Sequence, residues 1–515
     1  MLASATVFLD STVINVALPR IGHDLPHSIV GVLEGQTYVY SGYLLSLSAL
    51  LILAGALTDA YGRRRMFLAG LAGFVITSTL CGLARNLEAL VVLRVLQGVA
   101  GAFLVPGSLA LIAAAFRGPM QSRAYGVWSA AASGTTLLGP ALGGILVDTI
   151  SWRVAFFINI PVAAVAFYAA WRHVPESRAE VRSSRFDWLG AIAVGLAVGG
   201  LAFGAVYGQQ REWRDPTAYV VVAVGLVATA ALPLLMARRR NPLIPLSLFK
   251  SRAFTTINIS TLLIYGALYA SGYNTALFLQ GTLGYTPTAA GLLFLPAGIM
   301  LTLLSARFGT LAGRYGARPF LIVGPILVAA GTLWYARIPA TSQGWSLQPD
   351  HVSSLLPPRD YFVDILPGTL VSGLGMAILV APLTAALMAS APVGNAGLAS
   401  SINNAVSRIG PQLAGAVIFI AVTAIFYSSL VSRMPGIDSS TMRTMVSPLN
   451  RPSAGAPATM AVQARYASAD AFHAAMLISA GLFLAGAVTN AIGVPRKQPE
   501  PAAADKVPEG AAPAA

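Results

Sequence analysis

The sequence predicts an all-α polytopic membrane protein. Hydrophobic residues make up 56% of the 515 residues and charged residues only 10%, whereas soluble domains carry about 25% charged residues. Mean hydropathy is +0.70, and 50 glycines and 32 prolines suit the close packing and broken helices of membrane bundles. Apolar runs of about 20 residues recur along the chain, and each is long enough to span a bilayer as a helix.

The net charge and the cysteine count narrow the class of protein further. A net charge of +14 suits basic loops beside an anionic membrane leaflet, so we expect no nucleic-acid partner. The single cysteine, Cys81, rules out a disulfide framework or a cysteine metal site. The sequence has no phosphate-binding G-x-x-x-x-G-K-[ST] loop and no metal-spaced histidine cluster, so we expect no cofactor, no metal and no enzymatic activity. No basic segment precedes the first apolar run, so no cleavable signal peptide is expected.

Fourteen transmembrane helices are predicted in order along the chain, each from an apolar run of about 20 residues. The first six runs cover residues 2–21, 36–58, 66–84, 89–113, 124–147 and 152–171. The other eight cover residues 187–208, 217–237, 254–279, 289–310, 318–336, 362–388, 397–427 and 471–492. The 397–427 run is longer than a bilayer requires, so we expect it to tilt or to extend beyond the membrane.

The distribution of Lys and Arg predicts that both termini lie in the cytoplasm. In that orientation the inner loops carry 16 of the 33 basic residues and the C-terminal tail carries three more, against 11 in the outer loops. Four of those 11 lie in the long 428–470 segment, which counts little for topology. The bias also favours an even number of spans, and we expect a multi-pass protein of the cell (plasma) membrane.

A weak internal repeat predicts two related halves. Residues 55–65 read GALTDAYGRRR and residues 309–319 read GTLAGRYGARP, with five of eleven positions identical. Residues 428–470, which are polar and contain Ser, Pro and Gly, are expected to form a long outer loop. The predicted organisation is an N-terminal six-helix half (1–171), a two-helix insert with cytoplasmic loops (172–252), a C-terminal six-helix half (253–492) and a disordered cytoplasmic tail (493–515).

The stretch Leu9-Asp10-Ser11-Thr12-Val13-Ile14-Asn15-Val16-Ala17-Leu18-Pro19 places a carboxylate within the first apolar run. A charged side chain there costs roughly 2.5–3.5 kcal/mol on insertion scales, and such residues commonly mark ion or substrate pathways. No other acid is placed as deep in a predicted span. Asp10 is therefore the candidate proton-carrying group, with a purely structural tie between helices as the alternative.

Four further motifs follow Asp10 along the chain. Glycines in the first permit a tight turn, and its Asp59 can cap a helix or pair with an arginine. Pro140 in the third is expected to kink its helix, while the glycines beside it allow close approach by a neighbour. The motifs are Gly55-x-Leu57-x-Asp59-x-x-Gly62-Arg63-Arg64-Arg65, Arg94-x-x-Gln97-Gly98-x-x-Gly101-Ala102, Gly139-Pro140-x-x-Gly143-Gly144 and Trp152-Arg153-x-x-Phe156-Phe157-Ile158-Asn159-x-Pro161.

Together these motifs resemble the fourteen-helix branch of the drug–proton antiporters in the major facilitator superfamily. The resemblance covers nearly the whole chain, apart from residues 428–470 and the tail. It implies the major facilitator fold, with two six-helix halves and two inserted helices. In relatives the acid that matches Asp10 is associated with proton or cation coupling, and the arginine that matches Arg94 lies near the proton path.

The resemblance also implies roles for two of the glycine-containing motifs. In the superfamily the 55–65 loop acts as a conformational latch on the inner face, and the latch residues here are Gly55, Asp59, Gly62, Arg63 and Arg64. The pattern in the fifth helix is associated with exchangers rather than symporters, and its residues here are Gly139, Pro140, Gly143 and Gly144. A positive-inside anchor and ordinary small-residue packing are the plainer interpretations of these two motifs.

Arg94 is the expected partner of Asp10. At 1.5 Å per residue, Arg94 lies roughly 9 Å from the outer end of its helix and Asp10 roughly 15 Å from the outer end of the first helix. A buried arginine keeps its charge and needs a partner, and its long side chain spans that difference in depth. We predict that the pair is coupled to proton transfer, with a structural ion pair that does not gate transport as the alternative.

Aromatic and amide side chains in other spans are candidates for a broad, amphipathic substrate cavity. For each of them alone, packing or hydrogen bonding between helices is the alternative. Arg408 lies deep in the predicted 397–427 span with no acid nearby in the sequence, and it could meet an anionic group of a substrate or a lipid. The cavity candidates are Asn15, Tyr43, Gln97, Asn159, Tyr269, Tyr273, Asn274 and Asn403.

The sequence thus predicts a proton-driven exporter of small amphipathic compounds, of the multidrug efflux type, that works by alternating access. Its expected partners are a small-molecule substrate, protons and the lipid bilayer, and we expect it to act as a monomer. An exporter of an endogenous lipid, siderophore or metabolite on the same fold is the first alternative. A membrane scaffold or sensor that does not transport is the second.

Overall fold

A computed structural model describes residues 2–26, 32–178, 187–210, 215–239, 242–347, 352–392, 395–435, 437, 442, 445–450, 452 and 455–495. Regular structure in this part of the chain is helical throughout. The N-terminal helices are α1 (Leu2–Asp24), α2 (Val32–Tyr61), α3 (Arg63–Gly82), α4 (Leu87–Gly101), α5 (Leu104–Ala115), α6 (Gly118–Thr149), α7 (Val154–Phe157) and α8 (Asn159–His173).

The remaining helices follow in the same order as the predicted spans. Next along the chain are α9 (Trp188–Gln210), α10 (Pro216–Ala237), α11 (Ser247–Lys250), α12 (Arg252–Leu277), η1 (Phe278–Thr282), α13 (Pro287–Leu292) and α14 (Leu295–Tyr315). The last are α15 (Arg318–Tyr335), η2 (Val352–Leu355), η3 (Tyr361–Ile365), α16 (Leu366–Ala389), α17 (Ala396–Arg433) and α19 (Ala458–Gly493).

Twelve helical stretches of the described residues are long and apolar enough to cross a membrane. A shorter apolar stretch, Leu2–Ile14, lies in α1. Every predicted span overlaps one helix or two consecutive helices. The prediction of an all-α polytopic membrane protein is therefore confirmed.

Several predicted spans are divided where one helix gives way to another. The 89–113 span forms α4 and α5, the 152–171 span forms α7 and α8, and the 289–310 span forms α13 and α14. The π-helical segments η1 and η3 adjoin α12 and α16. In a membrane bundle, neighbouring helices can satisfy the backbone groups that such a break leaves unpaired. The sequence can therefore remain apolar across the break, and hydropathy alone does not locate it.

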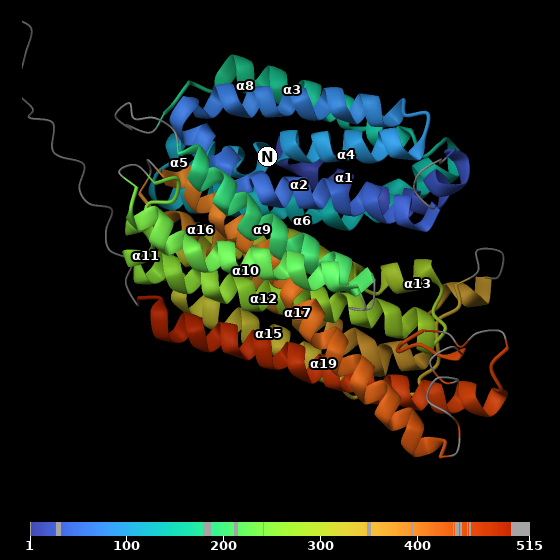
Figure 1. Ribbon diagram of the computed structural model, residues 1–515. Coiled ribbons are helices and arrows are strands. Elements are labelled where there is room, and N and C mark those ends of the chain that lie inside the picture. Colours follow the sequence, from blue (N-terminus) through green and yellow to red (C-terminus); the bar gives the residue numbers. More distant parts are fainter. Residues whose placement is uncertain are drawn as a thin grey trace, which may run out of the picture.

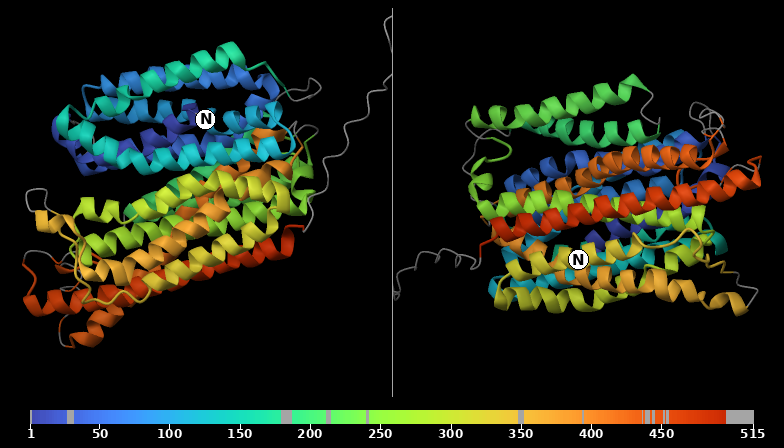
Figure 2. Two further views of the ribbon diagram at one scale, coloured as in Figure 1. Left: turned by 180° about the vertical axis from the view of Figure 1, so that it is seen from behind. Right: turned by 90° about the horizontal axis from the view of Figure 1, so that it is seen from below.

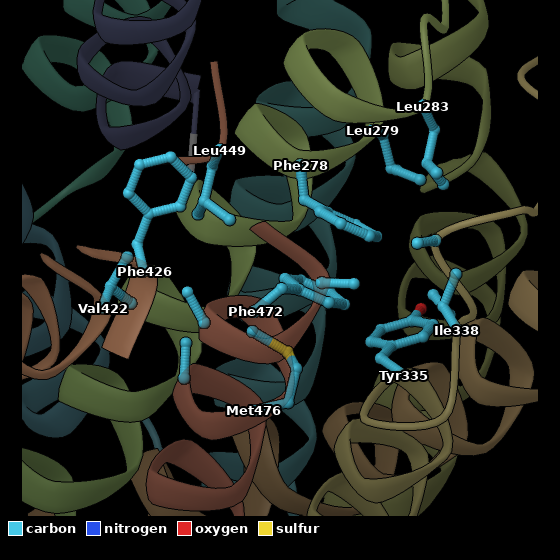
Figure 3. Packing of buried hydrophobic residues seen from close by; sticks show 14 of the residues in the cluster. Phe278, Leu279, Leu283, Tyr335, Ile338, Val422, Phe426, Leu449, Phe472 and Met476 are labelled. Carbon is cyan, nitrogen blue, oxygen red and sulfur yellow. The ribbon is translucent and has the colours of Figure 1, made fainter. Parts of the chain in front are cut away.

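The predicted outer loop over residues 428–470 is wrong at both ends, because α17 and α19 each extend into it. Met460 and Ala464, in the first turns of α19, are buried in the same cluster as Phe278 and Phe472. The rings of Phe278 and Phe472 stack with centroids 4.1 Å apart (Figure 3). Polar residues in this stretch lower its hydropathy, but the helical spacing of its apolar residues decides the structure.

The helices form two groups that lie side by side (Figure 1). α1–α8 pack mainly among themselves, as do α12–α19, and the paired helices α9 and α10 adjoin the two groups through α9, which contacts α2 and α17. Views from behind and from below show the same grouping (Figure 2). Two seams join the groups, one between α2 and α17 and the other between α6 and α14.

The repeat detected in the sequence recurs in the structure. Gly62, between α2 and α3, has a φ of 113°, and Gly316, between α14 and α15, has a φ of 85°, a region that favours glycine. Arg64 donates a hydrogen bond to a carbonyl near the end of α8, and the equivalent Arg318 donates to a carbonyl near the end of α19 at 2.6 Å. Equivalent residues thus make equivalent contacts. We call the end of the bundle that carries these two glycine turns the turn end.

Small residues bring the two groups close together on the side of the turn end. A Cβ atom added at Gly55 of α2 would lie 2.6 Å from the Gly397 carbonyl oxygen of α17. A Cβ atom added at Gly126 of α6 would lie 3.0 Å from the Ala306 Cα of α14. Real Cβ contacts are almost never this short, so both seams depend on glycine.

Candidate functional site

Asp10 lies in α1, is fully buried, and accepts hydrogen bonds from three side chains. Arg94 Nη1 lies 2.5 Å from Asp10 Oδ2. Gln97 Nε2 and Asn159 Nδ2 donate to Asp10 Oδ1 at 3.0 Å and 3.2 Å. Arg94 and Gln97 lie about one turn apart on α4, and Asn159 begins α8. Both oxygens of the carboxylate are therefore satisfied, as a buried charge requires.

Arg94 is held by groups from two helices besides its ion pair. Its Nε donates to the Val39 carbonyl oxygen of α2 at 3.1 Å, and its Nη1 donates to Gln97 Oε1 at 2.8 Å. The guanidinium carbon lies 4.1 Å from the ring centroid of Tyr43, a favourable cation–π distance. The predicted contact between Asp10 and Arg94 is confirmed, and its role in proton transfer stays a prediction.

Three of the predicted cavity residues surround this ion pair. Tyr43, Gln97 and Asn159 are fully buried, so none of them faces solvent in this conformation. Asn159 Nδ2 also donates to Ser78 Oγ at 3.0 Å, which ties the carboxylate to α3. The spacing of Arg94 and Gln97 on one helix face was the signal that could have assigned Gln97 to Asp10.

The other cavity candidates lie in the second helix group, apart from Asn15. Asn274 Nδ2 donates within its own helix at 2.8 Å, and Asn403 Nδ2 donates to Thr261 Oγ1 of α12 at 2.9 Å. Tyr269 and Tyr273 are 59% and 68% exposed, and they are discussed below. Three site candidates lie outside the residues whose surroundings the structure describes, namely Asn15 in α1 and Pro140 and Gly144 in α6.

Asp59, at the end of α2, joins the two helix groups at the turn end. Its Oδ1 accepts hydrogen bonds from Arg63 Nε and Nη2, both at 3.0 Å. Its Oδ2 accepts the Leu398 backbone N–H in the first turn of α17 at 3.0 Å. A carboxylate at this position satisfies one of the unpaired N–H groups of the helix and complements its dipole. The close packing of Gly55 and Gly397 lies beside this contact.

A second carboxylate caps α3 at the same end. Gly62 precedes α3 and has no side chain that could cap it. Glu176 replaces that cap, because its Oε1 and Oε2 accept the backbone N–H groups of Arg64 and Arg65, both at 3.0 Å. The sequence offered no sign of this contact, since Glu176 lies 112 residues from Arg64.

Replacing Asp59 with alanine is expected to loosen the contact between α2 and α17. The change removes the acceptor at Leu398 N–H and leaves the buried Arg63 without that acid. A capping interaction is worth about 1–2 kcal/mol. Its loss corresponds to roughly a tenfold change in the equilibrium constant for separating α2 from α17 at this contact. In a Cys81→Ser, Ser401→Cys background, alkylation of the new thiol by a water-soluble maleimide should therefore speed up about tenfold.

Asp470→Ala is the matched control for this experiment. Asp470 also pairs with an arginine, Arg433, at 2.9 Å, but it lies in α19 away from the seam. Its removal should leave the alkylation rate within about twofold, the range of typical surface changes. Equal rates for Asp59→Ala and the parent would contradict a closing role for Asp59.

Gly139 and Gly143 of α6 form the contact with α1 that positions Asp10. A Cβ atom added at Gly139 would overlap Thr12 Oγ1, and one added at Gly143 would lie 3.1 Å from Val13 Cα. Thr12 lies two residues from Asp10 on α1. The glycines of this motif therefore determine how closely the helix carrying the carboxylate approaches α6.

A buried acid paired with an arginine inside a helical membrane bundle is a feature that secondary transporters use in ion and substrate pathways. A family model of the Major Facilitator Superfamily matches residues 1–415. The chain belongs to the Major Facilitator Superfamily.

Named relatives and a solved structure agree with this assignment. Multidrug resistance protein Stp of Mycobacterium tuberculosis is 33% identical over 413 residues, which cover 80% of this chain and 72% of the relative. The tetracenomycin C resistance and export protein of Streptomyces glaucescens is 31% identical over 418 residues, or 81% and 74% of the two chains. The human organic anion transporter MFSD10 (TETRAN) has the same fold, with a TM-score of 0.57 at 15% identity over 95% of this chain and 98% of that chain.

Proposed function

We propose that this protein is a proton-driven exporter of small amphipathic compounds, of the multidrug efflux type. The observation that carries the proposal is the Asp10 carboxylate, which is fully buried and bound by Arg94, Gln97 and Asn159. A buried acid in a transporter commonly belongs to an ion or substrate pathway. The names of the relatives, which include multidrug resistance and tetracenomycin C resistance and export, favour this substrate class.

Proton binding at Asp10 would act directly on its ion pair with Arg94. Protonation removes the negative charge, so the attraction to Arg94 Nη1 at 2.5 Å is lost. The guanidinium then lies buried without a counter-charge, which is strongly unfavourable, and a rearrangement of α1 against α4 relieves that cost. Release of the proton restores the pair. Alternating these two states between opposite sides of the membrane would exchange protons for substrate.

The proposal includes the topology on which alternating access depends. Fourteen spans would comprise residues 1–171 as one six-helix half, 172–252 as the insert with α9 and α10, and 253–492 as the other half. Both termini would be cytoplasmic and the protein would act as a monomer in the plasma membrane. The turn end would then face the cytoplasm, and the Asp59 contact to α17 would close that side.

Asp10→Asn is the variant that tests the proposal. We expect it to insert normally and to abolish efflux driven by an imposed proton gradient in proteoliposomes, because an amide cannot carry the proton. Binding of the same compounds without a gradient should persist. The measurement is gradient-driven movement of a panel of neutral, cationic and anionic amphipathic dyes and antibiotics.

Asp364→Asn is the control, because Asp364 lies in η3, far from the ion pair in the sequence, where its Oδ2 accepts a hydrogen bond from Ser342 Oγ at 2.8 Å. It should transport like the parent. A fully active Asp10→Asn variant would refute the proton-coupling role. Transport restricted to a lipid, siderophore or metabolite in the same panel would instead favour the endogenous-substrate alternative.

A further inference from the structure

Arg408 is a half-buried arginine within α17, 12 residues from Ala396, which corresponds to roughly 18 Å along the helix. The buried arginines Arg63 and Arg94 each pair with a carboxylate. Arg408 differs from them, since no described residue supplies it with an ion pair or hydrogen bond. A charge at such depth is costly when it has no partner, so its position calls for an explanation.

Arg408 lies on the face of α17 that is turned towards α2. A Cβ atom added at Gly55 of α2 would lie 2.8 Å from Ser401 Cβ of α17, and Arg408 follows Ser401 by seven residues, or about two turns, on the same face. Tyr265 and Tyr269 follow one another on α12, with ring centroids 6.5 Å apart. Arg408 is near enough to Tyr269 for its charge to act on the hydroxyl group.

Arg408 also faces the first helix group. Its charge acts on Tyr43, and Tyr40, three residues away on α2, acts on Tyr269 of α12. Tyr269 thus lies within electrostatic range of both Arg408 and Tyr40, and 59% of its surface is exposed. The contact of Gly55 with Gly397 lies on the turn-end side of the same seam.

We infer that Arg408 recognises an anionic group of the transported compound, so that amphipathic acids are a preferred substrate class. A guanidinium presents paired N–H donors that match a carboxylate, sulfonate or phosphate. Tyr269 and Tyr273 supply exposed aromatic surface for the apolar part of the same molecule. This inference rests on the proposed function, because it assigns a substrate class to the proposed exporter.

Tyr43 connects this anion site with the proton site. Its ring lies beneath Arg94, with the guanidinium carbon 4.1 Å from the ring centroid. The charges of Asp10, Arg94 and Arg408 all act on its hydroxyl group. An anion bound at Arg408 and a charge at Asp10 would therefore act on the same buried side chain, in surroundings where charges interact more strongly than in water.

Two dyes that differ only in a sulfonate provide the test. 8-Anilinonaphthalene-1-sulfonate carries the anionic group, and N-phenyl-1-naphthylamine has the same rings without it. Binding of each is measured with the full-length protein in nanodiscs of zwitterionic lipid, with empty nanodiscs subtracted. Arg408→Gln should weaken binding of the sulfonate at least about tenfold, the usual scale of a charged hydrogen bond, and should change binding of the neutral dye less than about twofold. Arg408→Lys should retain part of the lost affinity.

Arg337→Gln is the matched control, because it removes one positive charge at the end of α15, where Arg337 stacks on Trp334 at 3.7 Å. The Arg337→Gln variant should bind both dyes with the affinity of the parent protein. Equal weakening of both dyes by Arg408→Gln, or equal effects of the two glutamine variants on the sulfonate, would overturn the inference. Repeating the titration with phosphatidylglycerol in the nanodiscs distinguishes the source of the anion. Loss of the difference between parent and Arg408→Gln there would mean that a lipid headgroup, not a substrate, occupies the site.

These experiments distinguish a failure of the proton-coupling proposal from a failure of the anion-site proposal. If Asp10→Asn abolishes gradient-driven efflux but Arg408→Gln binds both dyes like the parent, only the anion site is refuted. If Asp10→Asn transports fully while the sulfonate still depends on Arg408, only proton coupling is refuted.

Discussion

Arg94→Met is expected to destabilise the protein by about 3–5 kcal/mol, the usual cost of removing one partner of a buried ion pair. Methionine fills a similar volume but leaves Asp10 Oδ2 without its donor at 2.5 Å and the Val39 carbonyl without its donor at 3.1 Å. Gln97 and Asn159 still bind Oδ1, but they carry no charge. The midpoint of thermal unfolding of the detergent-purified protein, followed by tryptophan fluorescence, should fall clearly.

The double variant Asp10→Asn, Arg94→Met determines whether the loss comes from the orphaned charge. It removes both charges, so it should be more stable than Arg94→Met alone, as expected when a buried ion pair is replaced by neutral groups. Arg94→Lys keeps the charge but cannot bind both Asp10 and the Val39 carbonyl, so its stability should lie in between. If the double variant were no more stable than Arg94→Met, the loss would reflect packing rather than charge.

The second large effect is expected at Gly139. Gly139→Ala places a methyl group where Thr12 Oγ1 now lies, so α1 must move away from α6. Overpacking of this kind costs about 1–3 kcal/mol. Because Asp10 lies two residues from Thr12 on the same helix, the shift also disturbs the geometry of its ion pair. Gradient-driven efflux should fall in parallel with the unfolding midpoint.

A glycine with open space around it controls for the substitution itself. A Cβ atom added at Gly195 of α9 would meet nothing within 4 Å, so Gly195→Ala should be neutral or stabilise by about 0.4–1 kcal/mol. Adding Thr12→Ala to Gly139→Ala removes the overlapping hydroxyl group and should restore part of the lost transport. Normal transport by Gly139→Ala would show that α1 tolerates a wider spacing from α6.

The order of the helices and the partner of Asp10 could be predicted because both depend on local properties of the sequence. Every apolar run that was predicted to span the membrane coincides with one helix or two consecutive helices. Depth along two helices was enough to pair Asp10 with Arg94, since a buried arginine has few acids to choose from. The glycine turn at Gly62 and its equivalent at Gly316 were visible as a repeated string.

Contacts between distant segments could not be predicted in the same way. Glu176 caps α3 from a loop more than 100 residues away, and no local pattern marks it. Asn159 was placed in the substrate cavity, although it hydrogen-bonds to Asp10, because an amide suits either environment equally well. The start of α19 was assigned to a loop because hydropathy measures the average of both helix faces, whereas only the buried face, with Met460 and Ala464, determines the fold.

The two seams between the helix groups differ in what it costs to separate them. The seam between α2 and α17 contains a charged acceptor, Asp59, which binds the first turn of α17. The repeat carries Gly313 at the position equivalent to Asp59, and the seam between α6 and α14 is a close contact of small residues, Gly126 with Ala306. Separating α2 from α17 must break a charged hydrogen bond, whereas separating α6 from α14 breaks only packing contacts between small residues. The two seams are therefore held by different kinds of interaction.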